Sequence, residues 1–452
     1  MKTKFLTFAL LFLGITLASS QNIIPYLSVL GRHFGTEEVV TDPNTGHKVI
    51  YYFGGMTVGT GGAYKNDILK MDMETWEITK IENSTGDLPP KMVFHSSSIF
   101  DGKIFIYGGF KFDDNNQLIT NLDYAIYIYD IANNHWTLNN ISPSVISRKG
   151  MTSVENGAEV HLVGGKNADG TISNQYQLYD MNTNTVTQKT SINMGGIDGS
   201  AALIDNNKLY LIGGQTDYGI SGNILVYDLI NNFWSTTGIA GAFAPSTNAL
   251  IGHIGAHCLV WGGITSGSKK STNSISTSLF NIYFDMQSNQ LISEEITSNL
   301  PPLANGVSWV DIASGDTIIY AFSGINNITT TGDTAYNTNF YRYNITDDIV
   351  QQFDTTQQTW GGLISSINGT EFKTSKELSV YPNPANEQIS VSLQTNEPIR
   401  TLKIYNQNGQ LVQLINSKAN IETINISNLT GGIYYLRIDT DKNFYLGKLI
   451  KK

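Results

Sequence analysis

The sequence predicts an all-β protein built from repeated four-stranded units. Its 452 residues include 43 glycines, 11% aromatic and only 15% charged residues, which suits short aromatic strands joined by polar turns. No stretch after the first twenty residues shows a sustained 3.6-residue period. Six apolar runs end in a glycine pair or a close equivalent: Gly54-Gly55, Gly108-Gly109, Gly164-Gly165, Gly213-Gly214, Gly262-Gly263 and Ser323-Gly324. A spacing of about fifty residues is typical of a propeller or another stacked array.

Each unit predicts the same four strands. In the second unit, a first strand at 93–100 turns through Asp101-Gly102 into a second strand at 103–107, because Asp-Gly between apolar runs favours a tight hairpin. A polar loop is expected over 110–123, before the third and fourth strands.

The end of the third strand repeats as well. A large apolar residue precedes Asp or Asn in every unit, and this predicts an Asx-type turn: Met71-Asp72, Tyr129-Asp130, Tyr179-Asp180, Tyr227-Asp228, Phe284-Asp285 and Tyr343-Asn344. Six residues after the polar position an apolar anchor returns in five units: Trp136, Val186, Trp234, Leu291 and Val350. In the first unit Trp76 lies only four residues on, so we expect a shorter turn there.

Taken together, these glycine pairs, Tyr-Asp steps and spaced tryptophans resemble kelch repeats. The resemblance covers roughly Arg32 to Phe353 and implies a six-bladed kelch-type β-propeller over 21–353, similar to the central domain of galactose oxidase. The third, fifth and sixth units depart from it because they lack the fourth-strand tryptophan. A seventh cryptic blade stays open, and the strand that closes the ring is either 23–30 or 360–367.

The N-terminus predicts export. Residues 1–20 combine Lys2 and Lys4 with an apolar run and a small-residue cleavage site, as in a secretory signal peptide. No later segment is apolar enough to predict a membrane span. The single cysteine, Cys258, excludes an intrachain disulfide, and a net charge of −10 argues against binding nucleic acid through its phosphates.

The glycine-pair repeat does not continue beyond a polar segment at 354–376, which we interpret as a linker. Residues 377–452 alternate as short strands and predict a small Ig-like β-sandwich. Four features resemble the C-terminal sorting domain of type IX secretion cargo in Bacteroidetes: Tyr381-Pro382-Asn383-Pro384, Asn408-Gly409, Gly432-Ile433-Tyr434 and the ending Lys448 to Lys452. The resemblance implies handling by the type IX machinery and a secreted or cell-surface protein that passes through the periplasm. An ordinary Ig-like adhesion module is the alternative.

Binding is expected on one face of the propeller. The connections between strands two and three are long, and they emerge beside those that lead from strand four to the next unit. The aromatic candidates in these loops are Tyr64, Phe110, Phe112, Tyr218 and Tyr336. Near the starts of the innermost strands, at the channel mouth, lie His33, Lys91, His95, Arg148, Asp198, His253 and Trp309.

The sequence favours binding of an extracellular glycan or protein without catalysis, cofactor or metal. A galactose-oxidase-like copper site needs a cross-linked cysteine, but Cys258 lies in an apolar run. A sialidase is disfavoured because no Asp-box repeats accompany the few arginines. A carbohydrate-active enzyme such as a sialic acid mutarotase-like epimerase remains the alternative, with Arg148 beside His95 or Asp198 as its acid/base group. The run Asp113 to Asn116 could contact Ca²⁺, but we interpret it as a polar loop.

Overall fold

The computed structural model describes most of the chain between residue 32 and the C-terminus. The described residues are 32–43, 45–57, 63–119, 125–140, 148–254, 256–266, 273–298, 300–313, 316–328, 334–345, 349–355, 359–363, 378–393, 398–406, 411–417, 419, 421–439 and 444–452. Within these ranges every regular element is a β-strand, which confirms the all-β prediction. No helix capable of crossing a membrane occurs among them. The predicted signal peptide at 1–20 and the closing-strand candidate at 23–30 lie outside the described residues.

Six sheets of four or five strands follow one another along the chain. The first sheet contains β2 (Thr36–Thr41), β3 (Lys48–Phe53), β5 (Ile68–Asp72) and β6 (Ile78–Lys80). The second contains β8 (Lys91–Phe100), β9 (Lys103–Phe112), β10 (Ala125–Asp130) and β11 (His135–Asn140). The third contains β12 (Thr152–Asn156), β13 (Glu159–Val163), β14 (Tyr176–Asp180) and β15 (Thr185–Gln188).

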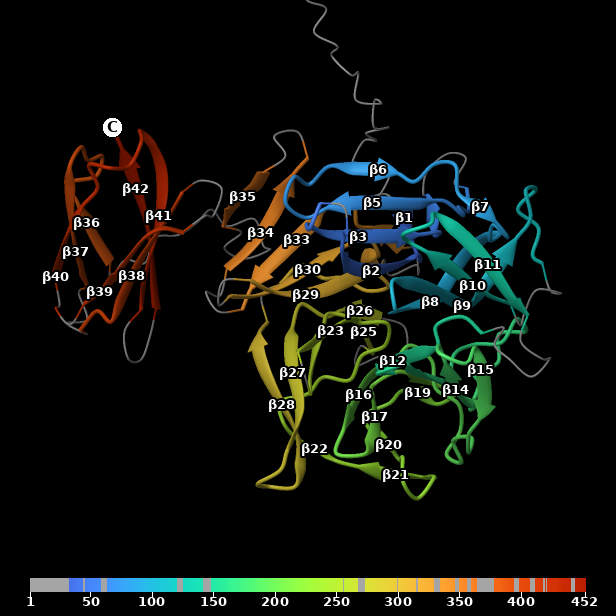
Figure 1. The fold of residues 1–452 in the computed structure, drawn as a ribbon. Coiled ribbons are helices and arrows are strands. Elements are labelled where there is room, and N and C mark those ends of the chain that lie inside the picture. The colour runs from blue at the N-terminus through green and yellow to red at the C-terminus, as the bar shows by residue number, and fades with distance from the viewer. Residues whose placement is uncertain are drawn as a thin grey trace, which may run out of the picture.

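The next three repeat this antiparallel order. The fourth sheet contains β16 (Ala201–Asp205), β17 (Lys208–Ile212), β20 (Ile224–Asp228) and β21 (Phe233–Thr237). The fifth contains β23 (Leu250–Ile254), β24 (His257–Trp261), β27 (Leu279–Asp285) and β28 (Gln290–Thr297). The sixth contains β29 (Val307–Ala313), β30 (Asp316–Phe322), β33 (Phe340–Asn344), β34 (Ile349–Asp354) and β35 (Thr359–Leu363). Figure 1 shows the six sheets placed in chain order, from blue to orange, around a common centre.

Short strands complete the sheets and their loops. Two add a parallel outer strand to a neighbouring sheet, namely β7 (Thr85–Gly86) beside β11 and β22 (Ile239–Gly241) beside β28. The others pair within the long-loop region: β1 (Arg32–His33) with β4 (Met56–Thr57), β18 (Gln215–Thr216) with β19 (Gly219–Ile220), β25 (Ile264–Ser266) with β26 (Asn273–Ile275), and β31 (Ile325–Ile328) with β32 (Thr334–Tyr336).

In the first five units the turn after the third strand is the Asx-type turn that the sequence predicts. In the sixth, turn residues 346–348 lie outside the described residues. Asp228 Oδ1 accepts hydrogen bonds from the amides of Ile230 at 3.0 Å and Asn231 at 2.8 Å. Asn232 closes the turn with φ of 58°, and its side-chain Oδ1 accepts a hydrogen bond from the Tyr227 hydroxyl at 3.0 Å. This left-handed conformation is one that Asn tolerates well.

The prediction of a shorter turn in the first unit is wrong. Ile78, six residues after Asp72, pairs with Met71 just as Trp136 pairs with Tyr129 in the second unit. The turn therefore has the common length, and Ile78 is its anchor. Trp76 takes the left-handed position, with φ of 61°, and its ring packs elsewhere.

The first and sixth sheets pack against each other through side chains. Residues 360–363 extend the sixth sheet through β35, whose Trp360 pairs with Phe353, so the described part of the closing-strand candidate 360–367 belongs to the sixth sheet and not to the first. Residues 364–367 lie outside the described residues. One core cluster spans both sheets, and Trp76 reaches across to Trp360 at a ring-centroid distance of 5.1 Å. We call this contact the seam. In the part of the chain that is described, no strand crosses it.

The C-terminal segment forms two sheets with their own core. One contains β36 (Leu378–Tyr381), β37 (Gln388–Leu393) and β40 (Ile421–Asn425), and the other β39 (Leu411–Asn416), β38 (Thr401–Asn406), β41 (Gly432–Asp439) and β42 (Phe444–Lys451). Every residue of their hydrophobic cluster lies between 378 and 449. The Asn383 side chain accepts the Ile450 amide at 2.9 Å, which ties the opening of the segment to its end.

Candidate functional site

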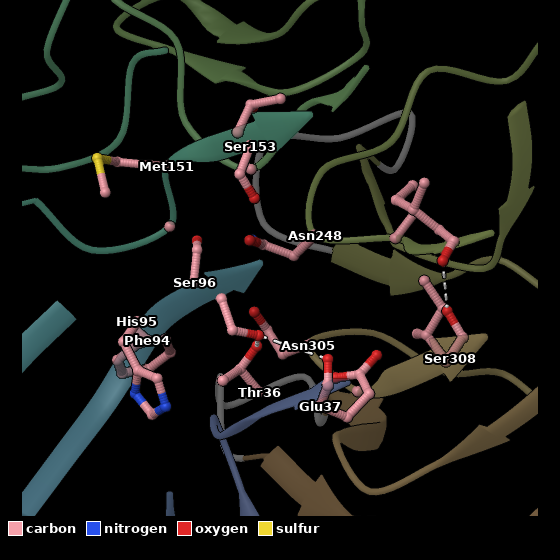
Figure 2. Close-up of a pocket in the computed structure, with 18 of the residues that line it drawn as sticks. Thr36, Glu37, Phe94, His95, Ser96, Met151, Ser153, Asn248, Asn305 and Ser308 are labelled. Atoms are coloured by element: carbon pink, nitrogen blue, oxygen red, sulfur yellow. Dashed lines mark hydrogen bonds between the residues drawn. The ribbon is translucent and has the colours of Figure 1, made fainter. Parts of the chain in front are cut away.

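A central cavity of about 360 Å³ lies among the first strands of all six sheets. Figure 2 shows Thr36, Ser96, Asn248 and Asn305 around this space, each from a different sheet or the segment that leads into it. Every sheet, or the segment that leads into it, contributes a hydroxyl or amide side chain to the lining, because the innermost strands carry small polar residues where a solid core would need apolar ones.

The mouth of the cavity is built from six backbone positions with left-handed conformations. They are Phe34, Phe94, Gly150, Gly199, Asn248 and Asn305, with φ between 53° and 64°. Phe94 lies within β8, and each of the others lies two residues before the first strand of its sheet. Each residue after the first donates its amide to the carbonyl of the preceding one, at 2.8, 3.4, 3.1, 2.8 and 2.9 Å along the series. This chain of hydrogen bonds fixes the shape of the mouth.

Phe34 and Phe94 are unusual occupants of these positions. The other four units place Gly or Asn there, residues that tolerate positive φ, whereas a bulky side chain is strained by it. Both rings line the cavity, and their centroids lie 4.3 Å apart. Such strain persists only where other interactions hold it, often at a functional site.

Further aromatic groups and one cation continue from this pair. Tyr336 packs on His33 with ring centroids 4.7 Å apart. On the other side, Lys149 Nζ lies 5.2 Å from the centroid of Phe94 and 5.2 Å from that of Phe110, within the range of a cation–π interaction. We call this set the aromatic arc: Tyr336, His33, Phe34, Phe94, Lys149 and Phe110.

The structure brings several of the predicted aromatic residues to this region. Phe112 stacks on Tyr64 with centroids 3.8 Å apart. The loop expected from residue 110 begins later, because β8 and β9 stay paired as far as Lys91 and Phe112. Tyr218 lies at the tip of the β18–β19 hairpin, 99% exposed, and makes none of the ring contacts of the arc.

Arg148 is committed to its own sheet. Its guanidinium donates to Ser173 Oγ and the Gln175 carbonyl, each at 3.2 Å, and to Gln177 Oε1 at 2.9 Å. Arg32, at the corresponding position of the first unit, binds Asp67 and the Gly54 carbonyl. Both arginines therefore fasten the start of a third strand.

The other two acid/base candidates have separate environments. His95 is buried and packs on Phe53 at 5.4 Å, and burial lowers its pKa to about 3. Asp198 pairs with Lys166 at 2.9 Å, and burial raises its pKa against the influence of that lysine. Among the described residues, no hydrogen bond or ion pair joins Arg148 to His95 or Asp198.

The remaining predicted residues lie at different depths. His253 lines the cavity, and although part of its ring is exposed to that space, the surrounding protein atoms lower its pKa. Trp309 is buried in the seam, where it stacks on Tyr320 at 4.9 Å. Lys91 Nζ donates to the Asp114 carbonyl at 3.0 Å, beside the Asp113 loop. The Asp113 carboxylate accepts two backbone amides, from Asn115 and Gln117, as in a polar turn.

The cavity holds carboxyl groups that resist ionisation. Burial raises the pKa of Glu37 well above its usual value, and burial followed by repulsion from Glu155 raises the pKa of Glu38 to about 8. Both side chains are partly exposed and line the cavity. No group of three or more metal-ligating residues in the described ranges has a metal-binding arrangement.

Sequence reasoning missed Phe34, Phe94 and Lys149. The signal that points to Phe94 is an alignment of units two to five at fourteen positions before the glycine pair, which gives Phe94, Gly150, Gly199 and Asn248. Phe34 and Asn305 lie twenty and eighteen positions before theirs, so this spacing does not find Phe34. For Lys149 the sequence offers no comparable signal, since its ring partners come from a different sheet.

Two family models match this chain. The Attractin/LZTR1 beta-propeller matches residues 50–327, and the secretion system C-terminal sorting domain matches residues 379–452. Beta-scruin of Limulus polyphemus is 23% identical over 261 residues, which cover 53% of this chain and 27% of that protein.

Two similar proteins of Arabidopsis thaliana extend the comparison. Acyl-CoA-binding domain-containing protein 4 is 23% identical and covers 61% of this chain and 41% of its own length. An F-box/kelch-repeat protein is 29% identical over 133 residues, or 29% of this chain and 34% of that protein. The chain thus spans well under half the length of these relatives.

Proposed function

Because the chain belongs to the Attractin/LZTR1 β-propeller family and ends in a type IX sorting domain that sends it to the cell surface or beyond, we propose that its propeller binds an extracellular glycan. The aromatic arc beside a hydroxyl-lined and amide-lined cavity carries this proposal. Sugar rings present apolar C–H faces that pack on aromatic rings, and their hydroxyls need polar partners. The protein acts as a binding protein and not as an enzyme.

A glycan suits this face better than a protein ligand does. A stable protein interface covers about 800 Å² on each partner and depends on a broad, well-packed patch. Here the polar groups converge in a cavity of about 360 Å³, a size that accepts a small ligand or one end of a sugar chain.

We further infer how the chain is organised. A signal peptide at 1–20 leads it across the inner membrane of a bacterium of the Bacteroidetes, and six blades form the propeller over 21–353. Six sheets with one strand order support that blade number. A linker at 354–376 precedes the sorting domain at 377–452, whose two sheets suit an Ig-like sandwich.

The test is binding of the purified chain to a panel of oligosaccharides, with Phe34→Gly and Phe94→Gly as variants. Glycine occupies the same backbone position in the third and fourth units, so each variant removes a ring without adding strain. We expect at least a tenfold loss of affinity with an unchanged or higher Tm. Tyr381→Ala, which removes an exposed ring from the C-terminal segment, is the control. Wild-type affinity in both glycine variants, or no glycan bound at all, would contradict the proposal.

A further inference from the structure

The cation of the aromatic arc lacks a carboxylate partner. Lys149 Nζ lies between the rings of Phe94 and Phe110, at 5.2 Å from each centroid. In the part of the chain that the structure describes, Lys149 forms no ion pair. The nearby Asp198 is paired with Lys166 at 2.9 Å and interacts with Lys149 only through longer-range electrostatics. The two rings hold the ammonium in place but cannot neutralise it.

The neighbourhood of Lys149 carries an excess of positive charge. Lys149 and Lys166 both act on the single carboxylate of Asp198. The protein as a whole has a net charge of −10. The local surface at the mouth of the polar cavity is therefore positive, although the protein as a whole is negative.

The acidic groups deeper in the cavity do not cancel this surface. Burial raises the pKa values of both Glu37 and Glu38, which favours the neutral form of these carboxyl groups. A protonated carboxyl group donates a hydrogen bond and does not repel an anion. An acidic ligand at the mouth thus meets the Lys149 ammonium, with carboxyl groups behind it that resist ionisation.

We propose that the ligand is an anionic glycan, whose carboxylate or sulfate group pairs with Lys149 while its sugar rings contact Phe34 and Phe94. This inference rests on the proposed glycan binding and specifies its ligand class. The geometry that supports it is the juxtaposition of an unneutralised ammonium, two strained phenyl rings and a hydroxyl-lined cavity.

Paired probes test charge separately from sugar binding. Oligogalacturonate is compared with its methyl ester, which keeps the sugar chain and removes the carboxylates, and dextran sulfate is compared with dextran. We expect the full chain to bind at least one anionic probe at least tenfold more tightly than its neutral partner, with an affinity that falls as salt rises. The carboxylate and sulfate arms identify which acidic group is recognised.

The matched variants are Lys149→Met and Lys208→Met. Methionine keeps the unbranched apolar stem of Lys149 over the rings and removes its charge, while Lys208 begins β17, at the opposite end of the sheet from the mouth. We expect Lys149→Met to lose about tenfold in affinity for the anionic probe and Lys208→Met to lose none.

Three outcomes would overturn this inference. Equal affinity for anionic and neutral partners, or tight anionic binding that Lys149→Met leaves unchanged, contradicts the role of the ammonium while glycan binding stands. Failure to bind every anionic and neutral sugar contradicts both the proposed function and this inference.

Discussion

The Ser323 hydroxyl donates a hydrogen bond to the main-chain carbonyl of Arg32 across the seam. At the five other junctions this contact is made by backbone: the second glycine of each pair donates its amide to the corresponding carbonyl, at 2.7–2.9 Å. A Cβ on the first glycine would lie 2.0 Å from the Ile197 carbonyl oxygen at Gly164 and 2.3 Å from that of Ser246 at Gly213. The seam has room for the serine side chain, whereas a side chain at Gly164 or Gly213 would meet this carbonyl oxygen.

We expect serine to stabilise the protein at position 323, in the seam, and to destabilise it at position 164, in another junction. Ser323→Ala keeps the positive φ of 64° and loses the hydrogen bond, so we expect a loss of about 1–2 kcal/mol in the free energy of unfolding. Ser323→Gly loses the same bond but relieves the backbone, so its loss should be smaller. Gly164→Ser should cost more than either, because its side chain meets the Ile197 carbonyl. Urea unfolding of the three variants checks this order; equal tolerance of serine at both junctions would contradict it.

Trp76 gives a case in which repeat consensus and packing disagree. Asn occupies the equivalent left-handed position in units two to five, so consensus predicts that Trp76→Asn stabilises the protein. However, the indole contacts Trp360, Phe353 and Phe340 at centroid distances of 5.1–5.6 Å. We expect a net loss of about 2–4 kcal/mol, measured by denaturant unfolding. A stabilised variant would mean that this cluster does not hold the seam.

Glu38 predicts a pH-dependent stability. Burial and repulsion from Glu155 raise its pKa from 4.5 to about 8, so folding takes up a proton between these values. Its contribution to stability is complete below pH 4.5 and falls as the pH rises towards 8. Glu38→Gln cannot ionise, and we expect its Tm to exceed that of the wild type by about 2 °C or more at pH 8. Near pH 4.5 the difference should shrink; a difference that is the same at both pH values would argue against ionisation of Glu38.

The turn aspartates predict sensitivity to acid. Hydrogen bonds from Asn231, at backbone and side chain, lower the pKa of Asp228, and a backbone hydrogen bond from Thr183 is the main cause that lowers the pKa of Asp180. Stability from a lowered carboxyl pKa is present above the ordinary value of 3.8 and is lost as the pH falls below it. Replacing both residues with Asn keeps an acceptor oxygen in each turn and removes the titration. We expect the double variant to lose less stability between pH 5 and pH 3 than the wild type, as measured by circular dichroism.

The C-terminal segment should unfold and sort independently of the propeller, because its core cluster contains only its own residues. Leu436→Ala removes a fully buried side chain from that core and should cost about 2–5 kcal/mol. We expect cell fractionation to show retention of this variant inside the cell, while the thermal transition of the propeller is unchanged. Val412→Ala, at an exposed position, is the control. Normal export of Leu436→Ala would contradict a need for a folded tail.

The sequence by itself determined the repeated β-units, their Asx turns and the sorting tail. These features depend on residues close in the chain, such as Asp228 with Asn231 or the glycine pairs after each second strand. Local backbone conformation can be predicted from such neighbouring residues. The same reasoning placed Tyr336, His33 and Phe110 near one face, because loops at one end of each unit must emerge together.

Only the tertiary structure decided what those residues touch. Lys149 meets Phe94 and Phe110 from another sheet, Trp76 meets residues nearly three hundred positions away, and Arg148 turns from the expected site to its own sheet. Each of these outcomes depends on how whole sheets pack around the centre. Contacts between distant segments depend on shape and spacing in three dimensions, which no local pattern of residues records.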